Sequence, residues 1–187
     1  MITDMFITGT EENVAGIYGI KFYIRGKPWV VSIDDKLLFE SGQLKYMKQA
    51  DNGAMWAAIL EKAWAKAKGA YGQANGGFVV SGLRAVTGAP VFQYIPADSD
   101  YSLSSTAAFD LLAAADAAGY PMGASTSSGS NQTPNDCGIA YGHAYSILTT
   151  FTMSGNKMVM LRNPWGTTGY TGSYHKDDTA WTDALAN

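Results

Sequence analysis

The chain has 187 residues, of which 47% are hydrophobic, and a formal net charge of −3 with acidic and basic residues interspersed. This composition excludes an intrinsically disordered chain, which requires low hydrophobicity and high charge. The sequence shows no basic stripe typical of nucleic-acid binding and no cationic amphipathic helix typical of a membrane surface. No apolar run approaches the roughly 20 residues of a membrane span. We therefore expect neither nucleic acid nor membrane as a partner.

The cysteine content and the N-terminus bear on the compartment. Cys137 is the single cysteine, so no intrachain disulfide can form, which fits a reducing compartment. The first residues have neither the basic region nor the apolar region of a secretory signal. We expect a cytoplasmic protein whose residues 1–15 are loosely structured.

The first half of the chain predicts a β-hairpin and then helices. Residues 17–25 and 29–33 are rich in β-branched and aromatic residues and flank a Gly-Lys-Pro break at 26–28, as in a hairpin. Residues 36–41 follow as a short third strand. A helix over residues 78–86 ends at a Gly-Ala-Pro stretch near residue 88, where we place a boundary between two lobes.

The clearest helix is predicted over residues 52–69. Asn52 caps its N-terminus, and Gly69 ends it. Trp56, Leu60 and Trp64 recur at helical spacing, which indicates a face packed into the core. The Gly-rich turn that follows lacks the Lys-Ser/Thr ending of a phosphate-binding loop.

The second half predicts a helix, a strand, an exposed loop and a hairpin. The helix covers residues 105–118 with Ser104 or Ser105 as its cap, and the strand lies near residues 122–126. The polar stretch 127–138 is an exposed loop. The hairpin pairs strands 142–152 and 157–162. Helices and strands alternate without a regular βαβ pattern, so the predicted class is α+β, with antiparallel strands and packed helices.

The ends of this last hairpin carry the residues of chemical interest. Strands that turn back near residues 153–156 bring His143 and Asn163 to the same open end. A symmetric pairing of the two would centre the turn on residue 153, so a bulge or an asymmetric loop is needed to set them side by side. Spacing alone leaves two interpretations open: an ordinary strand histidine beside an ordinary turn, or a paired catalytic site.

The chemistry of such a pair is specific. An asparagine carbonyl that accepts one imidazole N–H fixes the tautomer and leaves the other ring nitrogen free to take a proton from a nucleophile. An indole nearby, such as Trp165, would keep water from that hydrogen bond and strengthen it. His175, the other histidine, has no second ligand at metal-binding spacing and is expected on a surface loop.

The motifs GHAYSIL (residues 142–148) and LRNPWG (161–166) resemble the His and Asn motifs of the calpain family of papain-like cysteine proteases. The similarity is collinear from about residue 16 to residue 183. It implies that residues 16–88 form the C-terminal part of the cysteine-bearing lobe and residues 89–187 the lobe that carries His and Asn.

The resemblance also implies roles for individual residues. His143 would be the general base and acid, Asn163 its orienting residue and Trp165 the shield of their hydrogen bond. The substrate-binding positions would be glycines, namely Gly76, Gly77 and Gly142. The substrate would be a protein or peptide.

The chain departs from the family where the nucleophile is expected. The cysteine motif of calpains lies upstream of the hairpin, and nothing in residues 1–15 matches it. Cys137 lies in a polar loop beside Asp136, a neighbour that raises a thiol pKa. We therefore expect a core fragment that lacks the upstream Cys-bearing segment and is inactive in isolation.

Calcium is the second departure. Gly72 stands where the family has an acidic ligand, and Thr179-Ala180 stands where a glutamate is expected before Trp181. Calcium prefers several carboxylate oxygens. We expect no cofactor in this chain; the resemblance implies that a calcium site can exist in the parent protein. Two rival functions remain: a non-proteolytic calpain-like module that binds proteins, and a papain-like transferase, which would use Asp in place of Asn163.

Overall fold

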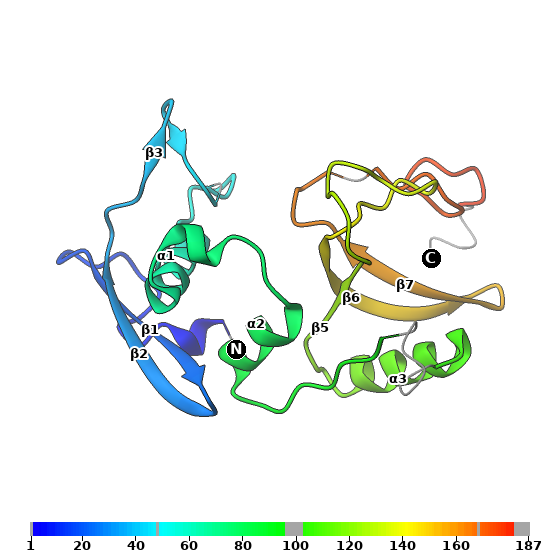
Figure 1. The fold of residues 1–187 in the computed structure, drawn as a ribbon, viewed down its shortest axis with the longest axis horizontal. Helices are drawn as coiled ribbons and strands as arrows, with labels where there is room; N and C mark the ends of the chain where they lie inside the picture. The colour runs from blue at the N-terminus through cyan, green and yellow to red at the C-terminus, as the bar shows by residue number, and fades with distance from the viewer. Residues whose placement is uncertain (1, 48, 96–102, 168, 182–187) are drawn as a thin grey trace. The chain divides into compact units, whose positions relative to one another are not determined.

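The computed structural model describes residues 2–47, 49–95, 103–167 and 169–181. The chain divides into two compact units, Met1–Phe92 and Gln93–Asn187 (Figure 1). This division falls a few residues beyond the lobe boundary expected near residue 88, and the parts of the expected lobe 89–187 at 96–102, 168 and 182–187 lie outside the described residues. All strand pairs are antiparallel and helices accompany both larger sheets, so the class is α+β as predicted.

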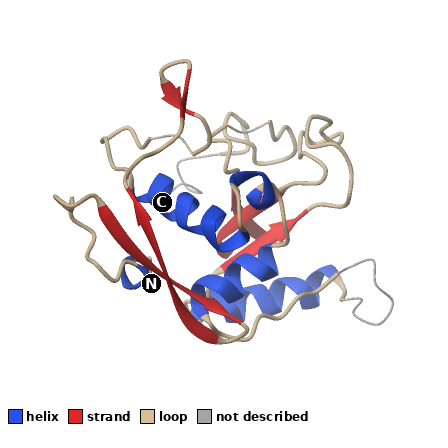
Figure 2. Cartoon of the chain, turned by 60° about the vertical axis from the view of Figure 1, so that its left-hand side comes forward, coloured by secondary structure: helices blue, strands red, loops and turns tan. Residues whose placement is uncertain are grey.

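The first unit is built on the predicted hairpin. Strands β1 (Ile17–Ile24) and β2 (Lys27–Asp34) pair in full register and form the long twisted ribbon of Figure 2. The two-residue turn is Arg25-Gly26, with positive φ at both residues (53° and 76°), the combination that matches the twist of a hairpin. The break is therefore shorter than predicted, because Lys27 and Pro28 already belong to β2.

The core of the first unit takes alternate residues of both strands. Ile20 and Phe22 of β1 are almost fully buried, and they pack with buried residues of β2 and of the first helix. The N-terminal segment adds to this core, because Met5 is 1% exposed and Phe6 forms a β-bridge to Ile20. Residues 1–15 therefore differ from the expected loose segment: burial of two large apolar side chains holds part of them against β1.

Helix α1 (Trp56–Lys68) starts later than predicted. The Asn52 side chain accepts the N–H of Ala54 in a turn ahead of the helix and makes no cap. The buried face is centred on Ile59 and Ala63, whereas Trp56 is 46% exposed, so the buried stripe is rotated from the predicted one. Gly69 ends the helix at φ 104°, as predicted.

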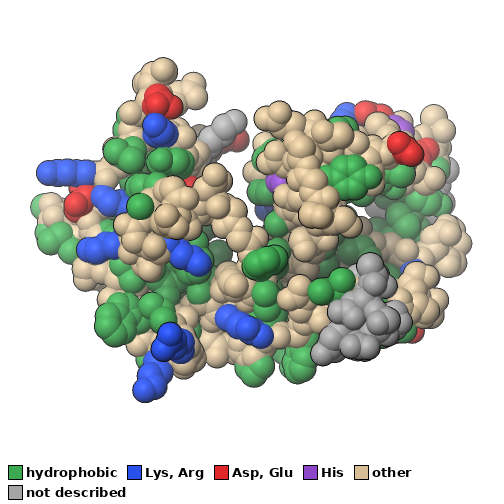
Figure 3. Space-filling model, in the orientation of Figure 1, with side chains coloured by type: hydrophobic (Ala, Val, Ile, Leu, Met, Phe, Trp, Pro, Cys, Tyr) green, Lys and Arg blue, Asp and Glu red, His purple; other side chains and the backbone are tan. Residues whose placement is uncertain are grey.

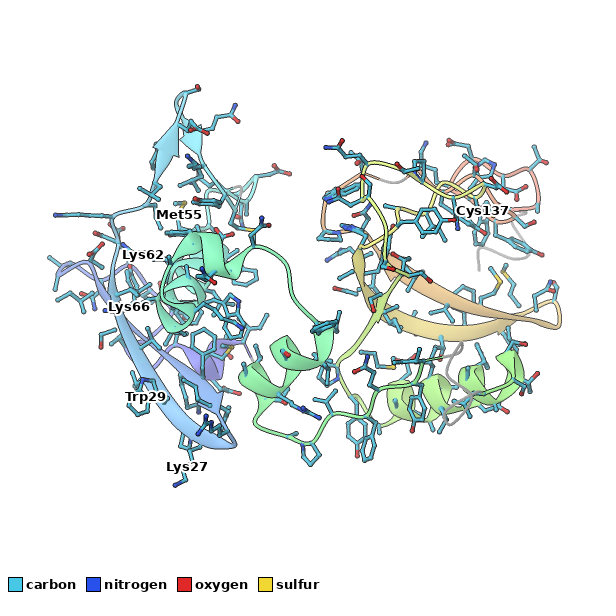
Figure 4. All side chains as sticks on the ribbon, in the orientation of Figure 1. Lys27, Trp29, Met55, Lys62, Lys66 and Cys137 are labelled. Carbon is cyan, nitrogen blue, oxygen red and sulfur yellow. The ribbon has the colours of Figure 1, made fainter. Side chains whose placement is uncertain are left out.

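Lysines of α1 tie the helix to the end of β2. Lys66 Nζ donates to the carbonyl oxygen of Ser32 at 2.7 Å, and Lys62 Nζ donates to the Asp34 carboxylate (Figure 4). These contacts give the helix a polar attachment beside its apolar one. Elsewhere on the face shown in Figure 3, basic side chains of this unit lie scattered among other residues.

The remaining elements of the first unit are short. They are β3 (Phe39–Glu40), β4 (Gln43–Leu44), the 3-10 helices η1 (Thr3–Met5) and η2 (Tyr71–Ala74), and α2 (Val79–Thr87). The third strand, predicted over residues 36–41, is thus reduced to β3, which pairs with β4 in a small hairpin whose strands have two residues each. Helix α2 ends at Gly88, which is in the left-handed conformation that suits glycine at a helix C-terminus.

The described residues of the second unit form one helix and a three-stranded sheet. Helix α3 (Ser105–Ala117) is capped by Ser104, whose Oγ accepts the N–H of Ala107 at 3.1 Å, one of the two caps predicted. The sheet has the order β5 (Met122–Ser125), β6 (Ala144–Met153), β7 (Asn156–Arg162). Among the residues that the structure describes, no helix is long and apolar enough to cross a membrane.

The β6–β7 hairpin contains the bulge that the sequence required. Its turn is Ser154-Gly155, with Met153 paired to Asn156, and the register shifts by one residue between Ile147 and Thr149. Leu148 is the extra residue. A shift of one residue exchanges the face on which every later side chain lies, which decides the geometry of the hairpin's open end.

Asp116, in the last turn of α3, joins the helix to β6. Its Oδ2 accepts the N–H of Thr150 at 2.7 Å and the hydroxyl of Thr149 at 2.8 Å. The Thr150 N–H and then the Thr149 hydroxyl hold the pKa of this carboxyl below its ordinary value of 3.8. Since the pKa is lower in the folded state, the stabilisation is complete above the ordinary pKa and is lost as the pH falls through the folded-state pKa.

We therefore expect the stability difference between wild type and Asp116→Asn to depend on pH in the acid range. Asparagine keeps an accepting oxygen but no charge, so the difference in free energy of unfolding should narrow as the pH falls below about 4. Urea denaturation at a series of pH values measures it. A difference that stays constant down to about pH 2 would contradict the assignment.

Candidate active site

His143 and Asn163 meet at the open end of the β6–β7 hairpin. His143 directly precedes β6 and Asn163 directly follows β7. The distance between His143 Nε2 and Asn163 Oδ1 is 2.9 Å, and the pair is partly buried. The structure thus brings together two residues that sequence spacing alone did not place side by side.

The hydrogen-bond network determines the tautomer of His143. Asn163 Oδ1 also accepts the backbone N–H of Trp165 at 3.0 Å. A backbone N–H only donates, so the atom it meets is the amide oxygen, and Nε2 of His143 must be the ring nitrogen that carries the proton. The neutral imidazole therefore has its lone pair on Nδ1. Among the described residues, Nδ1 has no hydrogen-bond partner.

The turn that follows β7 holds the amide in place. Pro164 has a fixed φ, and the N–H of Gly166 donates to the carbonyl oxygen of Asn163 at 3.1 Å. Gly166 itself has φ 73°, a conformation that glycine adopts without cost. The stretch Asn163-Pro164-Trp165-Gly166 thus forms a tight turn whose first side chain is oriented by its own backbone.

Trp165 lies against the imidazole, where the sequence predicted a shield. The centroid of its ring is 4.2 Å from that of His143, and the planes are inclined by 40°. The indole is still 48% exposed, so it covers the hydrogen bond from one side. A bond that is partly shielded from water is stronger than one in open solvent.

Two further residues contact His143 and were missed by the sequence analysis. Tyr145, two positions along β6 and on the same face, meets the imidazole edge-on with ring centroids 4.9 Å apart. Its hydroxyl accepts the N–H of Ala140 at 3.1 Å. The spacing of two residues on a predicted strand is a signal that could have identified Tyr145.

Thr126 holds the backbone of His143. Its Oγ1 accepts the His143 N–H at 3.0 Å and donates to the Ala140 carbonyl oxygen at 2.8 Å. Its own N–H donates to the His143 carbonyl oxygen at 2.9 Å. No local sequence pattern predicts this contact, because Thr126 and His143 are 17 positions apart.

Gly142 occupies a position that only glycine fits. Its φ is 54°, and a Cβ there would overlap the carbonyl oxygen of Gly129. Its N–H donates to the Ser127 carbonyl oxygen at 2.7 Å. The structure therefore gives Gly142 a backbone role beside His143, whereas the substrate-binding role expected from the sequence stays a prediction.

We expect Gly142→Ala to lower the free energy of unfolding of the second unit by roughly 3 kcal/mol, because backbone strain and the overlap with Gly129 add. Gly155→Ala is the matched control. Gly155 also has a positive φ (80°), but nothing lies within 4 Å of its Cβ position, so only the conformational cost of about 1 kcal/mol applies. Urea denaturation measures both, and equal losses would contradict the argument.

Gly76 and Gly77 lie in the first unit, on the loop between η2 and α2. They have φ values of 76° and 145°, and nothing lies within 4 Å of the place where a Cβ would be. The space where their side chains would be is therefore open. Their expected role in substrate binding stays a prediction.

Cys137 lies in the exposed loop that precedes Gly142. Its N–H donates to Asn135 Oδ1, and its carbonyl oxygen accepts the N–H of Thr171, so it sits beside the C-terminal segment (Figure 4). It is far from any described helix N-terminus along the chain, and within the described part no hydrogen bond or ring contact joins it to His143. This setting lacks the features that activate a thiolate.

The carboxylates near the C-terminus already have hydrogen-bond or ion-pair partners. Both oxygens of Asp178 accept backbone N–H groups, of Ala180 and then Tyr174, which lowers the pKa of this carboxyl. Asp177 is paired with Lys176, which lowers its pKa as well. Over the described ranges, no three acidic, histidine or cysteine side chains come together as a metal site would need.

Comparison with known proteins identifies the family. A family model described as calpain family cysteine protease matches residues 2–186. The chain is 32% identical over 188 residues to the calpain-type cysteine protease ADL1 of Oryza sativa subsp. japonica, covering 98% of this chain and 9% of that protein. It is 33% identical over 189 residues to the calpain-type cysteine protease DEK1 of Arabidopsis thaliana, with the same coverage of 98% and 9%.

An animal relative shows the same similarity. The calpain-2 catalytic subunit of Homo sapiens is 31% identical over 179 residues, which cover 91% of this chain and 25% of that protein. The chain thus spans about a tenth of the length of the plant relatives and a quarter of the human one. With a family model that extends over nearly all of its residues, the chain belongs to the calpain family of cysteine proteases.

Proposed function

We propose that this chain supplies the general base and its orienting residue to a calpain-type cysteine endopeptidase. The observation that carries the proposal is the hydrogen bond between His143 Nε2 and Asn163 Oδ1, with the lone pair left on Nδ1. Membership of a cysteine protease family gives the class of reaction. The protein or peptide substrate, the nucleophile and the roles of single residues belong to the proposal.

The proposed mechanism uses each atom of the pair. Nδ1 of His143 takes the proton of a cysteine thiol, and the thiolate attacks the carbonyl carbon of the scissile peptide bond. The imidazolium then gives its Nδ1 proton to the leaving amine as the C–N bond breaks, which leaves an acyl-enzyme. Nδ1 next takes a proton from water, whose oxygen attacks the thioester carbonyl carbon; the C–S bond then breaks, which releases the acid and leaves the thiolate, to which the imidazolium returns the proton.

In these reaction steps Asn163 orients the imidazole ring of His143 and stabilises its positive charge. Its oxygen stabilises the imidazolium through the Nε2–H bond and holds the ring so that Nδ1 keeps one direction. The indole of Trp165, 4.2 Å from the imidazole, limits water at that bond. Gly76 and Gly77 would let a substrate backbone approach closely, because they carry no side chain and nothing lies within 4 Å of their Cβ positions. For Gly142 the proposed substrate contact is through its backbone.

The nucleophile is proposed to come from a cysteine-bearing segment outside this chain, because Cys137 lacks an activating environment. We propose that calcium, where it acts in the parent protein, is held by residues other than Asp177 and Asp178. This is supported by the backbone and lysine partners that already occupy those two carboxylates.

A peptide-hydrolysis assay tests the proposal. The 187-residue chain should not cleave fluorogenic peptides, with or without calcium, whereas the gene product that joins it to a cysteine-bearing segment should, and a thiol-alkylating reagent should stop it. Cys137→Ser in that product should leave the rate unchanged. Turnover by the chain alone that disappears on Cys137→Ser would overturn the assignment. A thiol-bearing product without hydrolysis would favour a protein-interaction module.

A further inference from the structure

We propose that Asp116 is a positioning residue: it holds the bulge in β6 that places Asn163 on the same face of the sheet as His143. The inference deepens the proposed function and rests on it. Asp116 lies in the last turn of α3 and touches neither member of the pair. It acts on the register of the strand that follows His143.

The contacts of Asp116 are concentrated at the bulge. A single oxygen, Oδ2, accepts the Thr150 N–H at 2.7 Å, the Thr149 hydroxyl at 2.8 Å and the Thr150 hydroxyl at 3.2 Å. The register shift lies between Ile147 and Thr149, directly beside these donors. Hydrogen bonds to a charged acceptor are about twice as strong as bonds between neutral groups.

The carboxylate also covers an open edge of the sheet. The pairing of β5 with β6 covers residues 144–147 of β6, and among the described residues no strand pairs with β6 on that edge from Leu148 onward. Asp116 takes the backbone N–H of Thr150 at this place. The bulge thus lies where the pairing of β6 with β5 gives way to the hydrogen bonds between β6 and Asp116 of α3.

The donors fix one register. Thr149 and Thr150 both carry hydroxyl groups, whereas their neighbours along the strand, Leu148 and Phe151, carry none. Sliding β6 by one residue in either direction would bring one of these apolar side chains to the carboxylate and remove a hydroxyl donor. A buried or half-buried acceptor that loses its donors is destabilising.

The register decides whether the catalytic pair can form. With the bulge, Ser146 pairs with Arg162, so Asn163 comes opposite Tyr145, which is on the face of His143. If the register of Met153 and Asn156 continued without the bulge, Asn163 would lie opposite Ser146. Neighbouring residues of a strand point to opposite faces, so the amide would then lie on the wrong side of the sheet.

The ionisation of Asp116 supports the same role. The pKa of its carboxyl is lowered, first by the Thr150 N–H and then by the Thr149 hydroxyl. The side chain therefore stays charged, and keeps its strong acceptor, across the neutral pH range in which a His base operates.

The test uses the 187-residue chain with ¹⁵N-labelled histidine. The chain has two histidines, so the spectrum reports His143 with His175 as an internal reference. In wild type we expect His143 as a fixed Nε2–H tautomer, with well-separated Nδ1 and Nε2 resonances. Asp116→Ala should merge these resonances toward the averaged values of a mixed tautomer, and Asp116→Asn, which keeps an accepting oxygen, should restore their separation.

Asp110→Ala is the matched control. Asp110 is a carboxylate on the same helix, 62% exposed and paired with Lys157 of β7, away from the bulge. It should leave the His143 resonances unchanged. If Asp116→Ala prevents folding, the double variant Thr149→Val, Thr150→Val removes only hydroxyl donors and should also move His143 toward the mixed tautomer.

The outcomes separate this inference from the proposed function. A folded Asp116→Ala chain that keeps the Nε2–H tautomer would overturn the positioning role, as would an Asp110→Ala chain that loses it equally. If wild-type His143 shows no fixed tautomer, or Asn163→Ala leaves its resonances unchanged, the His–Asn pair itself fails, and with it the proposed function.

Discussion

Replacing His143 by alanine in the gene product that joins this chain to a cysteine-bearing segment is expected to lower kcat/KM for peptide hydrolysis by about a thousandfold or more. The imidazole acts twice, as base for the thiol and as acid for the leaving amine, and such proton transfers contribute about 10² to 10⁴ in rate. A thousandfold loss corresponds to about 4 kcal/mol of transition-state stabilisation. Steady-state kinetics with a fluorogenic peptide measure it.

His175→Ala is the control for this experiment. His175 lies in the C-terminal loop region, where its Nδ1 accepts the N–H of Asp177 and its carbonyl oxygen accepts the indole N–H of Trp181. We expect kcat/KM within about twofold of wild type, since surface changes of this kind shift free energies by about 0.5 kcal/mol or less. Full activity after His143→Ala would remove the basis of the proposed mechanism.

Replacing Phe22 by alanine is expected to lower the free energy of unfolding of the first unit by about 3–5 kcal/mol. Phe22 is 2% exposed, and its ring centroid lies 5.4 Å from that of Trp64, so it joins β1 to α1. Small domains are stable by only about 5–15 kcal/mol, so this cavity would remove a large part of the total. Urea denaturation, with hydrogen exchange of the β1 and β2 amides, measures the loss in this unit.

Phe39→Ala separates cavity formation from a general loss of aromatic surface. Phe39, in β3 of the same unit, is 64% exposed. Its removal should change the free energy of unfolding by about 0.5 kcal/mol or less. Similar losses for Phe22 and Phe39 would show that the hairpin and α1 do not share a common core.

Much of the secondary structure could be predicted because local chemistry specifies it. Gly26 and Gly155 mark the hairpin turns, Ser104 caps α3, and Gly69 and Gly88 end helices, all through backbone conformations or hydrogen bonds within a few residues. The predicted start of α1 was wrong, because the Asn52 side chain accepts the N–H of Ala54 in a turn and does not cap the helix. A cap signal in the sequence competes with other local uses of the same side chain.

The burial of the N-terminal segment could not be predicted from its own residues. Met5 and Phe6 belong to a short apolar run with Ile7 that is flanked by Asp4 and Thr8, and the two are buried because they pack on β1. The same holds for Thr126, whose hydroxyl accepts the backbone N–H of His143. It also holds for Tyr145, whose contact depends on the orientation of the His143 imidazole.

The sequence by itself determined the class of fold, the family, and the pair of side chains that could act as base and orienting group. Only the tertiary structure decided that His143 and Asn163 lie on one face, with Nδ1 as the free nitrogen. The physical reason is that turns and caps depend on neighbours along the chain, whereas strand register depends on contacts such as that of Asp116 with Thr150, 34 residues away.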